Sequence, residues 1–435
     1  MDRFLATLTA FFLTVGLLLP ASATANSGPV ALADTADEDV VSVFDDEDDE
    51  DTASAESAPQ SDEPSLSVDL NGSLRFNVLF RDYGKASEGP TIDNALSDGG
   101  FTFDTFRIGA SGSYGDLIFD AEYAIYPESF GGLYLHHGWV GYEFSDARQI
   151  QVGVSQVPFG IQPYASSSWF FNNTYYVGLE DDYDAGIKAL YQANGWDIQG
   201  AFYLNPEQTT FFAGADADRY SYDVVPSGGG GNLLASPRNI SEANQFNAKV
   251  AYSFDHGGLG FTKVGVSAQR GQLLNQTTDE TDWHAAYALH LQGRYGGFEA
   301  KLEFAQQELN PPSVEDDRFV VMGAYASPYR VASEHNVYSS SLAYHIPVNA
   351  GPISEIKPYY DFSQVTKEVD NWNDNVSHDI GFLTSAGPLF IYTDLNISKG
   401  HPFNQPFDST FAGALAQQND NEWRTAFNVN IGVYF

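Results

Sequence analysis

A two-residue period of apolar and polar side chains begins at Leu66, in the stretch LSVDLNGSLRFNVLFRDY. With Leu79 as the exception, one parity holds Leu66, Val68, Leu70, Leu74, Phe76, Val78 and Phe80, and the other holds Ser67, Asp69, Asn71, Ser73, Arg75, Asn77 and Arg81. This alternation predicts a two-faced β-strand far longer than the ~5–6 residues usual in soluble proteins. Such a length suits a barrel that crosses a membrane, where each strand needs about 9–11 residues in the hydrocarbon.

The same period recurs in WDIQGAFYL (196–204), FNAKVAYSF (246–254) and FEAKLEFAQ (298–306). In each segment the apolar parity is rich in Phe, Tyr, Val and Leu, whereas Asp, Glu, Lys and Asn occupy the other parity. An outward band of this composition is typical of a lipid-facing surface. The C-terminal NVNIGVYF (428–435) fits as a closing strand that pairs with the first strand, with Val429, Ile431, Val433 and Phe435 facing lipid.

The N-terminal segment has the features of an export signal. Arg3 precedes the apolar run FLATLTAFFLTVGLLLP, and Ala23 and Ala25 form a small-residue cleavage pattern. We therefore predict a signal peptide at residues 1–25, with a short membrane anchor as the alternative. Beyond it, no uncharged apolar run approaches the ~20 residues of a spanning helix.

Residues 26–64 differ from the rest of the chain, since they hold 14 acidic residues and neither Lys nor Arg. A run of like charges repels itself and buries no core, so we predict a disordered acidic arm at 26–64, followed by a barrel at 65–435. The formal charge of the whole chain is −38, which argues against a nucleic-acid partner because no basic face is available. The chain has no cysteine, which excludes disulfides and thiolate chemistry.

Connector lengths predict the topology. Seven short Gly-, Asn- or Asp-bearing turns occur at 114–116, 145–147, 193–195, 255–258, 295–297, 347–352 and 385–388. Long polar connectors fall at 84–100, 127–132, 158–183, 205–244, 272–282, 308–333, 367–374 and 399–421. Short turns at one end and long loops at the other predict an all-β, 16-stranded antiparallel transmembrane barrel. That count places the apolar segment 318–330 inside a loop, since an additional strand would break the alternation.

Three segments resemble the phosphate-selective porin O/P family of outer-membrane channels. They are GGFTFDTFRIGASGSYGD (99–116), VGYEFSDARQIQVGVSQVPFG (140–160) and the terminal NVNIGVYF. The resemblance implies a trimeric, water-filled channel in the bacterial outer membrane, with the third external loop folded inward. It also implies that Phe435 belongs to a signal read by the barrel-assembly machinery. The chain departs from the family's lysine-rich pores, since it contains only eight lysines.

A diffusion pore needs a polar lumen and a constriction. The polar parity supplies the basic candidates Arg75, Arg81, Arg107, Lys249, Lys263, Arg294, Lys301 and Arg424. It also supplies the acids Asp69, Asp120, Glu122, Asp197, Glu299 and Glu303. Cross-strand pairing with neighbours is the alternative role for each of these side chains.

The third long connector, 158–183, is the candidate constriction. Its aromatic stretch SSSWFFNNTYY (166–176) is suited to packing against an inner wall, and Glu180, Asp181, Asp182 and Asp184 are candidates to face the arginine side. An ordinary surface loop with solvated acids is the alternative.

No motif points to a catalytic, cofactor or metal site. His136 and His137 are consecutive in a predicted strand, so we expect their side chains on opposite faces and no shared metal. We therefore expect passive diffusion of small hydrophilic solutes and ions across the outer membrane. The alternatives are an anion- or phosphate-selective channel, an outer-membrane β-barrel hydrolase, or a soluble β-rich binding protein such as a surface lectin.

Overall fold

The computed structural model describes residues 64–82, 100–207, 217–226, 239–406, 409–417 and 420–435. The described residues all belong to one compact unit, Thr35–Phe435. The predicted signal peptide, and the predicted acidic arm except for Pro64, lie outside the described residues.

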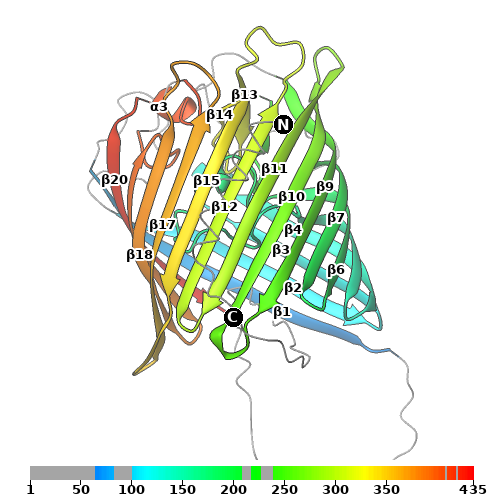
Figure 1. The fold of residues 1–435 in the computed structure, drawn as a ribbon, viewed down its shortest axis with the longest axis vertical. Helices are drawn as coiled ribbons and strands as arrows, with labels where there is room; N and C mark the ends of the chain where they lie inside the picture. The colour runs from blue at the N-terminus through cyan, green and yellow to red at the C-terminus, as the bar shows by residue number, and fades with distance from the viewer. Residues whose placement is uncertain (1–63, 83–99, 208–216, 227–238, 407–408, 418–419) are drawn as a thin grey trace, which may run out of the picture. The chain divides into compact units, whose positions relative to one another are not determined.

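Long β-strands dominate the described chain, and its helical segments are single turns (Figure 1). The elements are β1 (Leu66–Arg81), β2 (Gly100–Tyr114), β3 (Leu117–Ile125), η1 (Glu128–Phe130), β4 (Leu133–Ser145), β5 (Arg148–Gln156), α2 (Asn173–Tyr176), β6 (Tyr183–Ala193), β7 (Trp196–Pro206), β8 (Asp223–Val224), β9 (Ile240–Asp255), η2 (Gly257–Leu259), β10 (Phe261–Asn275), β11 (Glu280–Tyr295), β12 (Phe298–Leu309), β13 (Phe319–Gly323), β14 (Tyr329–Ala332), β15 (Glu334–Tyr344), β16 (Ile346–Ala350), β17 (Ile353–Lys367), β18 (Asn375–Ala386), β19 (Leu389–Lys399), α3 (Ser409–Ala412) and β20 (Trp423–Tyr434).

The main sheet closes on itself through its first and last strands. β1 pairs antiparallel with β2 on one side and with β20 on the other, with Phe76 opposite Ile431 and Asn77 opposite Asn430. The closure extends to the last residue, because the backbone N–H and C=O of Phe435 both bond to Gly72, at 2.9 and 2.8 Å. The predicted role of the C-terminal segment as the closing strand is confirmed.

The barrel has sixteen strands, as predicted. The sheet contains seventeen segments, but β15 and β16 pair with the same neighbour, β17, and form one barrel strand interrupted at His345. Residues 318–330 lie outside this barrel, as the strand count required. They are not irregular, however, because β13 pairs with both β14 and β8 in a separate three-stranded sheet, here called the small sheet.

One predicted long connector is wrong. β10 extends to Asn275 and β11 begins at Glu280, so the predicted loop 272–282 is a tight turn between two long strands. Residues 276–282, QTTDETD, are polar throughout and therefore resemble a loop. Strand ends that project beyond the hydrocarbon are polar on both faces and have the same composition. We call the end of the barrel that carries the seven short turns the turn end, and the opposite end the loop end.

The two faces of the sheet differ as the alternation predicted. Large apolar side chains are exposed on the outside, including Leu70 at 76%, Val140 at 63% and Val266 at 52%. On the opposite parity, Lys249 and Asp361 are buried inside the barrel. Apolar surface on this scale is stable only against lipid, so the exterior is that of a membrane-spanning barrel. Among the described residues, no helix is long and apolar enough to cross a membrane.

A packed aromatic cluster lies inside the barrel near the loop end. It includes Tyr175 and Tyr176 of the stretch 166–176, which was predicted to pack against an inner wall, together with tyrosines of two other loops. Tyr175 and Tyr176 pack with Tyr222 and Tyr325, and their rings are 5–6 Å apart in edge-on or tilted contacts. These loop residues lie against apolar lumen-facing residues of the wall, among them Leu273, Ala288, Leu309, Val337 and Val365. The barrel interior therefore has a hydrophobic core near the loop end and a polar wall below it.

Replacing Ile108 with arginine tests the lipid-facing assignment. Its side chain is 52% exposed on the outer face of β2. Arginine on the lipid face of a barrel costs about 2–4 kcal/mol at the bilayer midplane, and we expect a loss of that order in Ile108→Arg. The measurement is urea-induced unfolding in lipid vesicles.

Ser111→Arg on the same strand is the matched control. Ser111 lies on the lumen parity, in register between Asp69 and Asp120, which would compensate the new charge. We expect a change below ~1 kcal/mol for this variant. Equal destabilisation by the two variants would contradict the assignment of faces.

Candidate functional site

The loop between β5 and β6, residues 157–182, lies inside the barrel, and we call it the inner loop. Its base is closed by the hydrogen bond from the Val157 N–H to the Asp182 carbonyl, at 2.8 Å. Most of its residues are buried, although it contains only one helical turn, α2. Because a buried irregular backbone needs hydrogen-bond partners, the lumen wall must supply them.

β12 holds the first part of the inner loop. The Glu303 carboxylate accepts a hydrogen bond from the Ile161 N–H at 2.7 Å. The Lys301 ammonium donates to the carbonyls of Tyr164 and Ser166, each at 3.1 Å. Gly160 is required at this contact, since its φ is 55° and an added Cβ would lie 2.5 Å from a Glu303 oxygen. Lys301 and Glu303 thus serve as anchors for the loop.

The wall strands β15 and β17 hold the middle of the inner loop. One carboxylate oxygen of Asp361 accepts hydrogen bonds from the backbone N–H groups of Ser167, at 2.9 Å, and Ser168, at 2.7 Å. The hydroxyls of Ser167 and Ser341 are 2.8 Å apart. A charged acceptor shared by two backbone donors is a strong contact, so Asp361 fixes the turn at Ser167.

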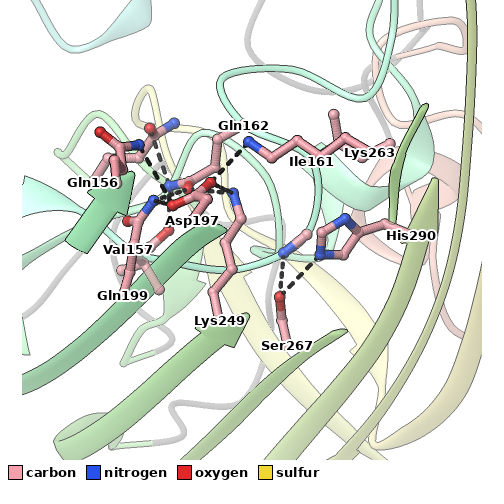
Figure 2. Close-up of polar contacts among 12 residues, drawn as sticks. Gln156, Val157, Ile161, Gln162, Asp197, Gln199, Lys249, Lys263, Ser267 and His290 are labelled. Carbon is pink, nitrogen blue, oxygen red and sulfur yellow. Dashed lines mark hydrogen bonds and ion pairs between the residues drawn. The ribbon is translucent and has the colours of Figure 1, made fainter. Parts of the chain in front are cut away.

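Lysines of neighbouring wall strands lie beside Gln162 of the inner loop, with Lys249 on β9 and Lys263 on β10 (Figure 2). Lys249 donates to the Gln162 side-chain oxygen at 2.6 Å, and Lys263 contacts Asp197 at 2.8 Å. Lys249 also lies 3.7 Å from Asp197, and Lys188 donates to the Gln156 carbonyl at 3.0 Å. Two ammonium groups therefore contact the Asp197 carboxylate at the edge of the loop, and that of Lys188 bonds to the loop's first neighbour, Gln156.

Two arginines form a second basic group on β1 and β2. Arg75 contacts Asp104 at 3.1 Å, and Arg107 contacts Glu122 at 3.2 Å. Arg107 also donates to the Tyr220 hydroxyl at 3.0 Å, and that hydroxyl donates to Asp181 at 2.9 Å. Tyr220 thus connects a wall arginine to an acid of the inner loop. Burial raises the pKa of Asp181, although Arg107 opposes the shift.

The other three candidate acids lie apart from the arginines. Glu180 accepts from the Ala165 N–H and from the Thr174 hydroxyl within the loop, and burial raises its pKa to about 8. Asp182 and Asp184 instead approach Asp223 of the small sheet. Burial and the neighbouring Asp184 raise the pKa of Asp182 well above its usual range. The structure therefore separates the four acids into three environments.

Five of the eight basic candidates lie on the wall around the inner loop: Arg75, Arg107, Lys249, Lys263 and Lys301. The remaining three lie near the ends of strands. Arg81 ends β1, Arg424 contacts Asp420 at 3.0 Å at the start of β20, and Arg294 is exposed near the turn end of β11.

The expectation for His136 and His137 is wrong. A β-bulge in β4 places Glu122 opposite His137 and Tyr123 opposite Leu135, which leaves His136 as the additional residue. Because a bulge turns two consecutive side chains to the same side, the two Nδ1 atoms lie 2.8 Å apart. Glu122, His136 and His137 have the donors of a transition-metal site, but Arg107 already contacts Glu122.

Sequence reasoning missed several residues of the site: Lys188, Asp361, Ser341 and Tyr220. Lys188 and Asp361 lie on the polar parity of their strands, so the alternation carried a signal for them. The sequence around Tyr220 does not indicate a site residue, because Tyr220 reaches Arg107 and Asp181 only when its loop folds back into the barrel.

Asp361→Ala tests the anchoring of the inner loop. It removes the acceptor of two backbone hydrogen bonds, and bonds to charged groups contribute about 1.5–3 kcal/mol each. We expect hydrogen exchange at Ser167 and Ser168 to accelerate at least about 10-fold, the factor for about 1.4 kcal/mol. Peptide-resolved exchange in detergent micelles measures this.

Asp361→Asn is the matched variant, because its side-chain oxygen can still accept from the same two amides. We expect it to retain most of the protection of Ser167 and Ser168. Wild-type exchange rates in Asp361→Ala would show that this wall contact does not hold the loop.

Comparison with known proteins shows relatives by structure and none by sequence: no family model and no curated protein match the chain. The outer-membrane channel DcaP of Acinetobacter baumannii superposes with a TM-score of 0.55 at 10% identity, covering 85% of this chain and 97% of that one. OmpF of Salmonella typhi gives 0.54 at 11% identity, with 85% and 97% covered.

An anion-selective porin from Comamonas acidovorans gives a TM-score of 0.50 at 14% identity, covering 85% of this chain and 100% of that one. Identities this low show the fold alone. The chain has the antiparallel transmembrane β-barrel fold that these outer-membrane channels and porins share.

Proposed function

We propose that the protein is a porin of the bacterial outer membrane, which forms a water-filled channel for passive diffusion of small hydrophilic solutes and ions. The observation that carries the proposal is the inner loop, which is held against a polar lumen wall by charged side chains of several strands. A loop held in this way narrows the lumen at a fixed level, which is the requirement for screening solutes by size and charge.

The charges around the inner loop support the same function. Lys249 and Lys263 lie on β9 and β10, and Asp361 lies on β17, farther along the same wall of the barrel. Charged side chains that line a narrow, low-dielectric passage create a field that orders water and favours small polar solutes. Diffusion through such a passage needs no catalytic group and no cofactor.

The resemblance to the phosphate-selective porin O/P family supports three further parts of the proposal. The barrel associates as a homotrimer in outer-membrane lipid, residues 1–25 direct export, and Phe435 is read by the barrel-assembly machinery. An outer-membrane protein of Vibrio cholerae with a TM-score of 0.50 to this chain is described in a trimer form. Phe435 is 56% exposed and ends the closing strand, so its ring is accessible to a partner.

Anion selectivity is a second candidate, favoured by the lysine cluster. Lys188, Lys249 and Lys263 converge on a wall segment where Asp197 is the contacting carboxylate. An excess of positive charge at the narrowest level attracts anions, whatever the charge of the surface loops.

Conductance of the purified protein in a planar bilayer tests the channel. We expect stepwise, ohmic current increments at high salt, grouped in threes for a trimer. A barrel hydrolase would insert without conducting, so the absence of any steps would contradict the proposal.

The reversal potential under a salt gradient tests the selectivity. Replacing both Lys249 and Lys263 with glutamine should lower the anion-to-cation permeability ratio about 5-fold, the factor for about 1 kcal/mol. Lys399→Gln is the control, since Lys399 lies at the loop end, where it donates to Asn421 at 3.0 Å. An unchanged ratio in the double variant would show that the lysine cluster does not set the selectivity.

A further inference from the structure

Acidic side chains from three separate segments converge at the loop end, next to the base of the inner loop. They are Asp182 at the end of the inner loop, Asp184 on β6, Glu207 after β7 and Asp223 on β8. One oxygen from each of Asp182, Asp184 and Asp223 lies within 4.8 Å of the others. Glu207 accepts hydrogen bonds from the N–H and the hydroxyl of Ser221, two residues before Asp223.

These carboxylates are buried, and several of their oxygens have no partner in the described part of the chain. Asp182 is 6% exposed, Asp184 2%, Glu207 4% and Asp223 1%. Oδ1 of Asp182, Oδ1 of Asp184 and Oε2 of Glu207 accept no hydrogen bond. A buried carboxylate oxygen without a donor is unfavourable, so something must satisfy these atoms in the folded protein.

Donors hold one oxygen of Asp184, one of Glu207 and one of Asp223. Gln245 donates to Oδ2 of Asp184 at 2.8 Å, and the Ser221 N–H and hydroxyl donate to Oε1 of Glu207 at 2.7 and 2.8 Å. Arg219 donates to Oδ2 of Asp223 at 2.8 Å. Asp184 and Glu207 are thus each oriented through one oxygen, as outer-shell donors orient metal ligands, while their second oxygen is left for another group.

The charge balance points to a cation. Arg219 brings one positive charge to Asp223, and one guanidinium does not neutralise four carboxylates. Glu242, which accepts from the Val224 N–H at 2.9 Å, adds a further carboxylate close by. Either protons or a bound metal ion must compensate the excess, and oriented, unpartnered oxygens favour the metal.

We propose that Asp182, Asp184, Asp223 and Glu207 form a binding site for a calcium ion. Calcium takes six to eight oxygen ligands at about 2.3–2.6 Å, so two oxygens on one ion lie up to about 5 Å apart. The oxygens of Asp182, Asp184 and Asp223 are within that limit. Magnesium fits less well, because it retains water and is seldom enclosed by protein ligands alone.

The ion would join the inner loop to the small sheet. Asp182 closes the base of the inner loop through its carbonyl, whereas Asp223 belongs to β8, which pairs with β13. Without the ion, carboxylates of these two segments repel one another across a buried contact. Calcium therefore acts as a clamp between the constriction and the packed loops at the loop end.

Calcium binding and thermal unfolding of the full chain in detergent micelles test the site. We expect one tight equivalent of ⁴⁵Ca²⁺ in equilibrium dialysis, besides weak binding by the acid-rich N-terminal residues. We also expect a higher apparent unfolding temperature in calcium than in EDTA, because a ligand at 100 times its Kd shifts the unfolding equilibrium about 100-fold. Magnesium at the same concentration should give a smaller shift.

The double variant Asp182→Asn/Asp184→Asn should lose the tight equivalent and the calcium-dependent shift. In EDTA it should unfold at or above the wild-type temperature, since two repelling charges are gone. Glu207→Gln is a milder second variant, and we expect it to weaken binding at least about 10-fold. Asp279→Asn is the matched control: this exposed turn residue has a φ of 59°, which asparagine tolerates, and it should leave binding unchanged.

Two results would overturn the site. The first is a wild-type chain that binds no tight equivalent and unfolds at the same temperature in calcium and in EDTA. The second is a tight equivalent that survives both the double variant and Glu207→Gln. In either case the carboxylates are compensated by protons.

Discussion

A strand in lipid cannot leave backbone hydrogen-bonding groups unpaired, and this constraint determines the rest of the structure. It requires β1 to pair with β20. In that pairing Ser73 lies opposite Tyr434 at one end, and Arg81 lies opposite Ala426 at the other. Closure then gives every strand an inner and an outer face. The outer face is apolar, and the inner face carries the polar groups that hold the inner loop. The proposed constriction thus depends on the same pairing that closes the barrel.

The barrel could be predicted from sequence because its signals, side-chain alternation and short turns, each lie within a few consecutive residues. Alternation such as that of Phe246–Phe254 gives the face of each residue, and short turns such as Gly296–Gly297 give the strand order. The count of sixteen strands is correct, but local irregularities within the strands were not predicted. The bulge at His136 follows from strand pairing and not from local sequence, and the break at His345 splits one barrel strand into β15 and β16. The ends of β10 and β11 were missed because they are polar on both faces.

The candidate site was predictable only on its wall side. Lys249, Lys263 and Lys301 follow from parity, and the inner loop was indicated by its place in the chain and by the family resemblance. The contacts between wall and loop were not predictable, because the bonded residues are more than 140 positions apart in sequence: Glu303 accepts from Ile161, and Asp361 accepts from Ser167. The aromatic stretch 166–176 was predicted to pack inside the barrel, but its partners were not, since Tyr220 and Tyr325 meet only after two distant loops fold into the barrel.

An engineered disulfide between the inner loop and the wall tests the central claim most directly. The chain has no cysteine, and the hydroxyls of Ser167 and Ser341 are 2.8 Å apart, so the double variant Ser167→Cys/Ser341→Cys places two thiols within bonding reach. If the inner loop lies in the lumen as described, mild oxidation of the folded barrel will join the two cysteines and leave no thiol for maleimide. If both thiols stay free and react with maleimide in the folded barrel, the loop does not occupy the lumen.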